Sequence, residues 1–163
     1  MAIEVGMKVP DVDLMLRTED AQNLKVPLGP KLKGRKVVLI GMPGAFTGTC
    51  TGSHVPSLVR TAPALAEKGV DEIIIFVVND PQATRAWAQF TGADKAGLTV
   101  LADPASALTQ ALEMCYDAPA AGMYRRCTRF SSVVEDGVVT HVMFENDFGV
   151  CDLTAGEAIL EAL

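Results

Sequence analysis

Apolar residues in the first two thirds of the chain form short unbroken runs that alternate with segments of helical spacing. The runs are rich in Val and Ile, as is typical of strands that are buried on both faces of a parallel sheet. Between the runs, apolar residues recur three and four positions apart, which predicts amphipathic helices. Strands are thus predicted at residues 36–41, 72–78 and 98–101, and helices at 50–68, 81–90 and 103–114.

The ends of these predicted helices carry recognisable signals. Asp80 and Asp103 each precede a proline, and an aspartate followed by proline is a typical helix start. Gly69 follows the first helix and is a typical stop. Cys115 lies where the third helix ends, and we expect it to be buried there.

The last third of the chain has a different pattern. Residues 129–134 and 138–144 are predicted to be two strands joined at Asp136-Gly137, a dipeptide that strongly favours a hairpin turn. Thr154 and Glu157 have the spacing of a capping box before a final helix. After an irregular N-terminal extension, these elements predict an α/β fold with a mixed central sheet and helices on both faces.

Length and composition fit a single domain spanning residues 1–163. A chain of 163 residues with 49% hydrophobic and 21% charged residues buries about 70% of its unfolded surface, which argues against intrinsic disorder. The net charge of −6 argues against a nucleic-acid partner. No apolar run approaches the roughly 20 residues that a membrane helix needs. The start of the chain resembles no targeting peptide, so a cytoplasmic location is the default expectation.

The four cysteines do not form a recognisable framework. Four in 163 residues is sparse for a disulfide-stapled secreted domain, so we expect a reducing compartment. No C-x-x-C motif occurs, and His54 and His141 lie far apart in the sequence, so we expect no metal site and no cofactor. One or two thiols at most are expected to take part in chemistry.

The segment from Gly41 to Pro56 joins the first predicted strand to the following helix. In an open α/β sheet such a junction lies at the crevice where ligands bind. The segment contains no lysine, which argues against a phosphate-binding loop. It places Cys50 at a helix N-terminus, where free N–H groups favour the nucleophilic thiolate. The alternative is that Cys50 is a small buried apolar residue, as most free cysteines are.

The neighbours of Cys50 match a known active-site signature. Pro43-x-x-x-Thr47-x-x-Cys50 resembles the signature of peroxiredoxins, and Pro43-Gly44-Ala45-Phe46-Thr47 with His54 and Pro56 is similar to the peroxiredoxin 5 (type II) subfamily. The likeness extends in order through residues 68–74, 78–81, 86–87 and 129–137. It implies a thioredoxin-like fold with an N-terminal extension.

The resemblance also implies an activity and a set of site residues. The expected reaction is thiol-dependent reduction of hydrogen peroxide and small alkyl hydroperoxides, with peroxynitrite as a further candidate, through a Cys50 sulfenic acid. By matching positions, Thr47 bridges the thiolate and the peroxide, Pro43 restricts access to sulfur, and Arg129 stabilises the thiolate. Arg125 and Arg126 are near enough in the sequence to compete with Arg129, and we otherwise expect them in a solvated turn.

His54 admits two interpretations. It lies four residues after Cys50, on the same helical face, so a Cys-His dyad of hydrolase type is one possibility. The resemblance instead implies that His54 supports the peroxidase site. His141 is expected to be structural or at the surface, and Trp87 to pack in the core or at a subunit contact.

The sequence leaves the recycling of the sulfenic acid open. One route is a one-cysteine cycle with glutathione or glutaredoxin, or thioredoxin, as the reductant; the other is an internal disulfide with Cys151. Cys127 could face the same pocket as Arg129 if one strand holds both residues. The resemblance implies a homodimer near the active-site loop, with Phe46 taking part. A non-catalytic thioredoxin-like redox or binding module is the alternative from a different class of function.

Overall fold

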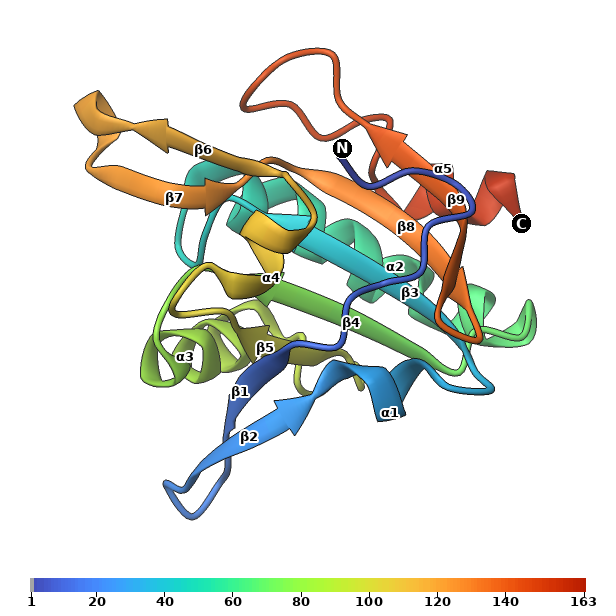
Figure 1. Ribbon diagram of the computed structural model, residues 1–163, viewed down its shortest axis with the longest axis horizontal. Helices are drawn as coiled ribbons and strands as arrows, with labels where there is room; N and C mark the ends of the chain where they lie inside the picture. Colours follow the sequence, from blue (N-terminus) through green and yellow to red (C-terminus); the bar gives the residue numbers. More distant parts are fainter. Residues whose placement is uncertain (1) are drawn as a thin grey trace.

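The computed structural model describes residues 2–163 and contains a seven-stranded mixed sheet (Figure 1). Its strand order is β2-β1-β5-β4-β3-β8-β9, and a separate two-stranded sheet pairs β6 with β7. The strands are β1 (Asp13–Arg17), β2 (Asn23–Pro27), β3 (Lys36–Met42), β4 (Glu72–Val77), β5 (Thr99–Ala102), β6 (Cys115–Ala118), β7 (Met123–Cys127), β8 (Phe130–Glu135) and β9 (Val138–Phe144). The helices are α1 (Leu28–Leu32), the π-helical turn η1 (Cys50–His54), α2 (Val55–Glu67), α3 (Pro81–Thr91), α4 (Ala107–Ala111), the 3-10 turn η2 (Pro119–Ala121) and α5 (Gly156–Ala162).

The three central strands β3, β4 and β5 run parallel, and every other pairing in the large sheet is antiparallel. The register places Ile40 of β3 beside Ile75 of β4 and opposite Ser131 of β8. The predicted mixed sheet is therefore confirmed. Because parallel strands end at one edge, the loops after β3, β4 and β5 gather there.

Helices cover both faces of the sheet, as predicted. On one face, α2, α3 and α5 pack against Val38, Ile40 and Met42 of β3 in a first core cluster, which includes the fully buried Trp87. On the other face, α1 and α4 pack against the alternate residues of β3, Val37 and Leu39. The core position predicted for Trp87 is thus confirmed, and Asp80 caps α3 by accepting a hydrogen bond from the Ala83 N–H at 2.9 Å.

Two segments differ from the sequence-based prediction. The N-terminal extension is not irregular throughout: β1 and β2 form a hairpin that adds an edge to the sheet (Figure 1). The helix predicted at 103–114 is reduced to α4, because Ser106 adopts a left-handed conformation with φ 58°. The Asp103 carboxylate accepts hydrogen bonds from the N–H groups of Leu108 and Thr109 instead of starting a helix at Pro104.

The predicted capping box before the last helix is also absent. Ala155 is the N-cap of α5, and the Gly156 N–H donates to the Ser57 hydroxyl oxygen at 2.9 Å. Glu157 pairs with Arg60 at 2.9 Å. Thr154 donates its hydroxyl to the Glu145 carboxylate, so tertiary partners satisfy the groups that a capping box would have paired. No helix within residues 2–163 is long and apolar enough to cross a bilayer.

Gly41, near the end of β3, provides a test of packing under the site. A Cβ there would lie 2.5 Å from Cys127 Sγ and 2.6 Å from Phe130 Cε1, so we expect Gly41→Ala to destabilise the fold by about 1–3 kcal/mol. A Cβ at Gly48 meets nothing within 4 Å, so Gly48→Ala is the control. Urea unfolding measures both, and equal stabilities would contradict the tight packing at Gly41.

Candidate active site

Hydrogen bonds within the loop and to distant segments hold the loop between β3 and η1 in shape. The Ala45 N–H donates to Asn79 Oδ1 at 2.9 Å, and the Thr47 hydroxyl donates to the Gly44 carbonyl at 2.7 Å. Arg126 Nη1 donates to the Pro43 carbonyl at 3.0 Å. The expectation that Arg126 lies in a solvated turn is therefore wrong: it is half-buried on β7 and braces the loop, whereas Arg125 is exposed.

Cys50 begins η1, a turn wider than the α-helix predicted there. The Val55 N–H donates to the Cys50 carbonyl, five residues back. Pro56 has no N–H, so the bond that would start an α-helix at Gly52 cannot form. The wider turn buries both Cys50 and His54 completely, and Trp87 Nε1 donates to the Thr51 hydroxyl at 3.0 Å beneath it.

Arg129, the residue before β8, joins the two ends of this turn. Its Nη2 donates to Cys50 Sγ at 3.2 Å, and its Nη1 donates to His54 Nδ1 at 2.9 Å. Only 7% of Arg129 is exposed. This places a buried positive charge at hydrogen-bond distance from the Cys50 sulfur, where it can stabilise negative charge that develops on a bound substrate.

His54 is neutral and acts as an acceptor toward Arg129. Burial and then the nearby Arg129 charge lower the pKa of His54 from 6.5 to about 3, against the opposing hydrogen bond to the Thr154 carbonyl. Nε2 donates to that carbonyl at 2.9 Å, which leaves the lone pair of Nδ1 for the guanidinium. Because that lone pair is occupied by Arg129, the hydrolase-type Cys-His dyad is contradicted.

Glu145 is a supporting residue that the sequence did not reveal. It follows β9, and its carboxylate accepts hydrogen bonds from the N–H groups of Asp152, Leu153 and Thr154 and from the Thr154 hydroxyl. Burial alone would raise the pKa of Glu145, but these hydrogen bonds lower it below its ordinary value. The carboxylate thereby holds the Thr154 carbonyl against His54. A glutamate after a hairpin strand is common at surfaces, so sequence offered no signal for this role.

A cavity of about 340 Å³ opens beside Arg129. The predicted residues Pro43 and Thr47 line it, and so do two aromatic residues that the sequence analysis missed, Tyr116 and Phe148. Their ring centroids are 5.3 Å apart, so β6 and the loop after β9 meet across the cavity. The remaining lining residues are Gly48, Thr49, Asp117, Ala118, Met123 and Gly149.

The other three cysteines lie outside this cluster. Cys151 is half-buried, with Sγ 3.9 Å from the Thr154 hydroxyl oxygen. Cys127 does not share a strand with Arg129, because β7 ends at Cys127, which is buried in the second core cluster beside Gly41. Cys115 is exposed on β6, so the prediction that it packs at a helix end is wrong.

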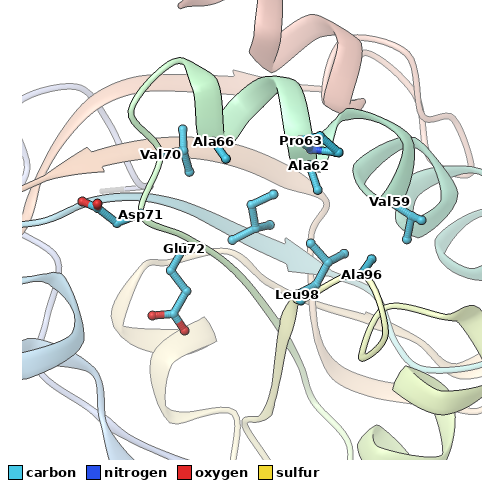
Figure 2. A pocket seen from close by; sticks show the side chains of 11 residues that line it. Val59, Ala62, Pro63, Ala66, Val70, Asp71, Glu72, Ala96 and Leu98 are labelled. Carbon is cyan, nitrogen blue, oxygen red and sulfur yellow. The ribbon is translucent and has the colours of Figure 1, made fainter.

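A second cavity, of about 370 Å³, lies between α2 and the start of β4 and carries no comparable chemistry (Figure 2). Its eleven lining residues are mostly apolar, and the two carboxylates lie at one side of it. Glu72 already binds Lys31 and Arg35, and Asp71 accepts the Lys36 N–H. In the part of the chain that the structure describes, no group of three or more His, Cys, Asp and Glu residues is placed to hold a metal ion.

The neutral His54 predicts a pH dependence of stability. Below pH about 6.5, His54 binds a proton in the unfolded chain but not in the native protein, whose His54 has a pKa of about 3. The His54 contribution to the free energy of unfolding is therefore greatest above pH 6.5 and decreases on acidification. Between pH 7 and 5 we expect a loss of about 2 kcal/mol from His54, measured by urea unfolding. Glu72 and Glu145, whose pKa values lie below 4.5, contribute only at lower pH.

The variant His54→Gln cannot titrate and is expected to lose most of this pH dependence, whatever its stability at pH 7. His141→Gln, on β9 and outside the Arg129 network, serves as the control and keeps the dependence. An unchanged slope in His54→Gln would show that His54 is not the group responsible.

Comparison with known sequences places the chain in a family. Residues 4–155 match the Redoxin family model. Peroxiredoxin-2D of Arabidopsis thaliana is 37% identical over 161 residues, covering 99% of this chain and 98% of the relative. Peroxiredoxin-2C of Oryza sativa subsp. japonica is 35% identical over the same length, with the same coverage.

Solved structures agree with this placement. Reduced Prx3 from Vibrio vulnificus in complex with hydrogen peroxide superposes with a TM-score of 0.90 at 32% identity, covering 98% of both chains. Peroxiredoxin 5 from Alvinella pompejana gives a TM-score of 0.84 at 26% identity, over 98% of this chain and 97% of its own. The chain therefore belongs to the Redoxin family and is a peroxiredoxin of the type II subfamily, a thiol-dependent peroxidase with a thioredoxin-like fold.

Proposed function

We propose that Cys50 is the peroxidatic nucleophile and that Arg129, Thr47 and Pro43 complete the site, with His54 as a positioning residue. The observation that carries this proposal is the hydrogen bond from Arg129 Nη2 to Cys50 Sγ, 3.2 Å long and next to a cavity that Thr47 and Pro43 line. The substrates are hydrogen peroxide and small alkyl hydroperoxides. The relative from Vibrio vulnificus was crystallised with hydrogen peroxide, which supports the first of these.

The reaction follows from the charges at the site. The Cys50 thiolate attacks one oxygen of the hydroperoxide, the O–O bond breaks, and the other oxygen leaves as hydroxide or alkoxide, which takes up a proton. Negative charge thus moves from sulfur to the departing oxygen, and the Arg129 guanidinium, held by His54, stabilises it in both places. The Thr47 hydroxyl donates to Gly44, so its oxygen can accept the peroxide proton.

The lining of the cavity supports alkyl hydroperoxides as substrates. Tyr116 and Phe148 supply an aromatic wall next to Arg129 and Thr47. Apolar walls exclude water and accommodate a small alkyl group while the polar end of the substrate meets Arg129. Peroxynitrite remains a further candidate, since it too presents an O–O bond and an anionic oxygen.

For recycling, we favour direct reduction of the Cys50 sulfenic acid by glutathione or glutaredoxin, with thioredoxin as the alternative. Cys151 is half-buried, and the following residues 152–154 are bound to Glu145, so an internal disulfide requires this segment to leave its place. A small thiol that enters the cavity beside Arg129 and Thr47 approaches Cys50 without displacing residues 152–154. All four cysteines are free, which supports a reducing compartment such as the cytoplasm.

The proposal includes a homodimer at the active-site loop. Phe46, in that loop, is 53% exposed, and its ring lies 5.6 Å from that of Phe90, which is 70% exposed. Two neighbouring exposed aromatic rings form an apolar patch of the kind that contacts a partner.

Substitution of Arg129 and Thr47 tests the assigned roles. We expect Arg129→Ala to slow oxidation of Cys50 by about 100- to 1000-fold, because the departing oxygen loses its cation. Thr47→Val is expected to slow it by at least about 10-fold. Stopped-flow fluorescence of Trp87, which lies against η1, measures the rate with hydrogen peroxide.

Arg125→Ala is the control, since Arg125 is exposed on the neighbouring strand, and it should retain the wild-type rate. A folded Arg129→Ala or Thr47→Val variant that reacts as fast as wild type would refute the role of that residue. Cys50→Ser is expected to lose the rapid oxidation by hydrogen peroxide, and oxidation of this variant at the wild-type rate would show that another thiol is the peroxidatic nucleophile.

The recycling route is tested by mass spectrometry after one equivalent of peroxide. We expect a Cys50 sulfenic acid that glutathione converts to a mixed disulfide, both in wild type and in Cys151→Ser. A Cys50–Cys151 disulfide in wild type, together with loss of thioredoxin-dependent turnover in Cys151→Ser, would establish the two-cysteine route instead.

A further inference from the structure

Two of the three cysteines outside the active site face each other across the small sheet. Cys115 of β6 and Cys127 of β7 are register partners. The flanking hydrogen bond from the Thr128 N–H to the Met114 carbonyl, 2.7 Å long, makes them a non-hydrogen-bonded pair. In such a pair the Cα atoms are about 4.5 Å apart and the side chains share a face, which lies within the range that a disulfide spans.

The shared face is the one opposite the active-site cavity. The next register pair, Tyr116 and Arg126, faces the cavity and the Pro43 carbonyl. Side chains alternate along a strand, so the cysteine pair points toward α4 and the turn before it. Cys115 Sγ accordingly lies 3.9 Å from the Ser106 hydroxyl oxygen.

The two thiols differ in accessibility, and this difference determines which of them reacts first. Cys115 is exposed, whereas Cys127 is fully buried and burial raises the pKa of its thiol. An oxidant in solution therefore meets Cys115 first. Cys127 can then reach the oxidised sulfur from across the strand pair by a rotation of its side chain.

We propose that Cys115 and Cys127 form a second redox site, at which a hydroperoxide converts the dithiol to a cross-strand disulfide. The Cys115 sulfur attacks the O–O bond and becomes a sulfenic acid, releasing water or an alcohol. The Cys127 sulfur then attacks the Cys115 sulfur; the S–S bond forms, the S–O bond breaks, and the oxygen leaves as water with the thiol proton. Two thiols are oxidised by two electrons, and one hydroperoxide is reduced.

This site responds to peroxide excess and is reversible. The buried Cys127 thiol is protonated and attacks slowly. The disulfide therefore forms only when peroxide is present in excess of what Cys50 removes by turnover. A disulfide that includes an exposed cysteine on a short strand pair is open to thiol reductants. The disulfide would hold together the two strands that carry Tyr116 and Arg126. Oxidation of this cysteine pair would thereby restrict the Tyr116 side of the cavity and the Arg126 bond to the Pro43 carbonyl.

The test uses Cys50→Ser/Cys151→Ser, in which only the two hairpin thiols remain, so its outcome does not depend on the role of Cys50. The protein is incubated with excess tert-butyl hydroperoxide, unfolded, and titrated for free thiols. We expect both thiols to disappear, a Cys115–Cys127 cross-linked peptide in the mass spectrum, recovery of both thiols with dithiothreitol, and a rise in Tm of about 5 °C in the oxidised protein.

The matched control adds Cys115→Ser, which leaves the buried Cys127 alone and is expected to retain its thiol with no change in Tm. Oxidation of Cys115 to a sulfinic acid or to an intermolecular disulfide, with Cys127 still a free thiol, would overturn the proposal. So would a cross-linked peptide that appears only after unfolding.

Discussion

The site depends on one buried cation. The Arg129 guanidinium is removed from water, and a charge in that position is tolerated only when its donors are paired. One pair of donors meets Cys50 Sγ and His54 Nδ1. The histidine therefore remains neutral, with its Nδ1 lone pair accepting one donor, and the sulfur accepts the other. A single buried cation thus organises both neighbours.

That requirement extends outward through backbone groups. His54 presents Nδ1 to Arg129 because its Nε2–H is bound by the Thr154 carbonyl, and Thr154 is held by Glu145. The residues involved come from η1, the position just before β8 and the segment after β9, which the mixed sheet brings together (Figure 1). The proposed nucleophile is consequently supported by elements that lie about a hundred residues apart in the sequence.

Much of the framework could be predicted from local patterns. Strands β3, β4, β8 and β9 and helices α2 and α3 follow from apolar runs, helical spacing and the Asp-Gly turn. The errors cluster where a side chain took a partner other than the one that its local pattern predicts: Asp103 binds N–H groups of α4 rather than a helix starting at Pro104, and Thr154 binds Glu145. The same applies to Arg126, whose bond to Pro43 links β7 to the loop after β3.

The sequence by itself determined the α/β architecture, the junction after β3 and the motif that identifies a peroxiredoxin, because these depend on residues close together in the chain. Only the tertiary structure decided that Arg129 reaches Cys50, that His54 is neutral, and that Cys115 and Cys127 are partners. The physical reason is that pairing of buried charges and strand register depend on which distant segments pack together. The pattern of hydrophobic residues determines which faces of the elements are buried, but it does not specify any individual contact between distant side chains.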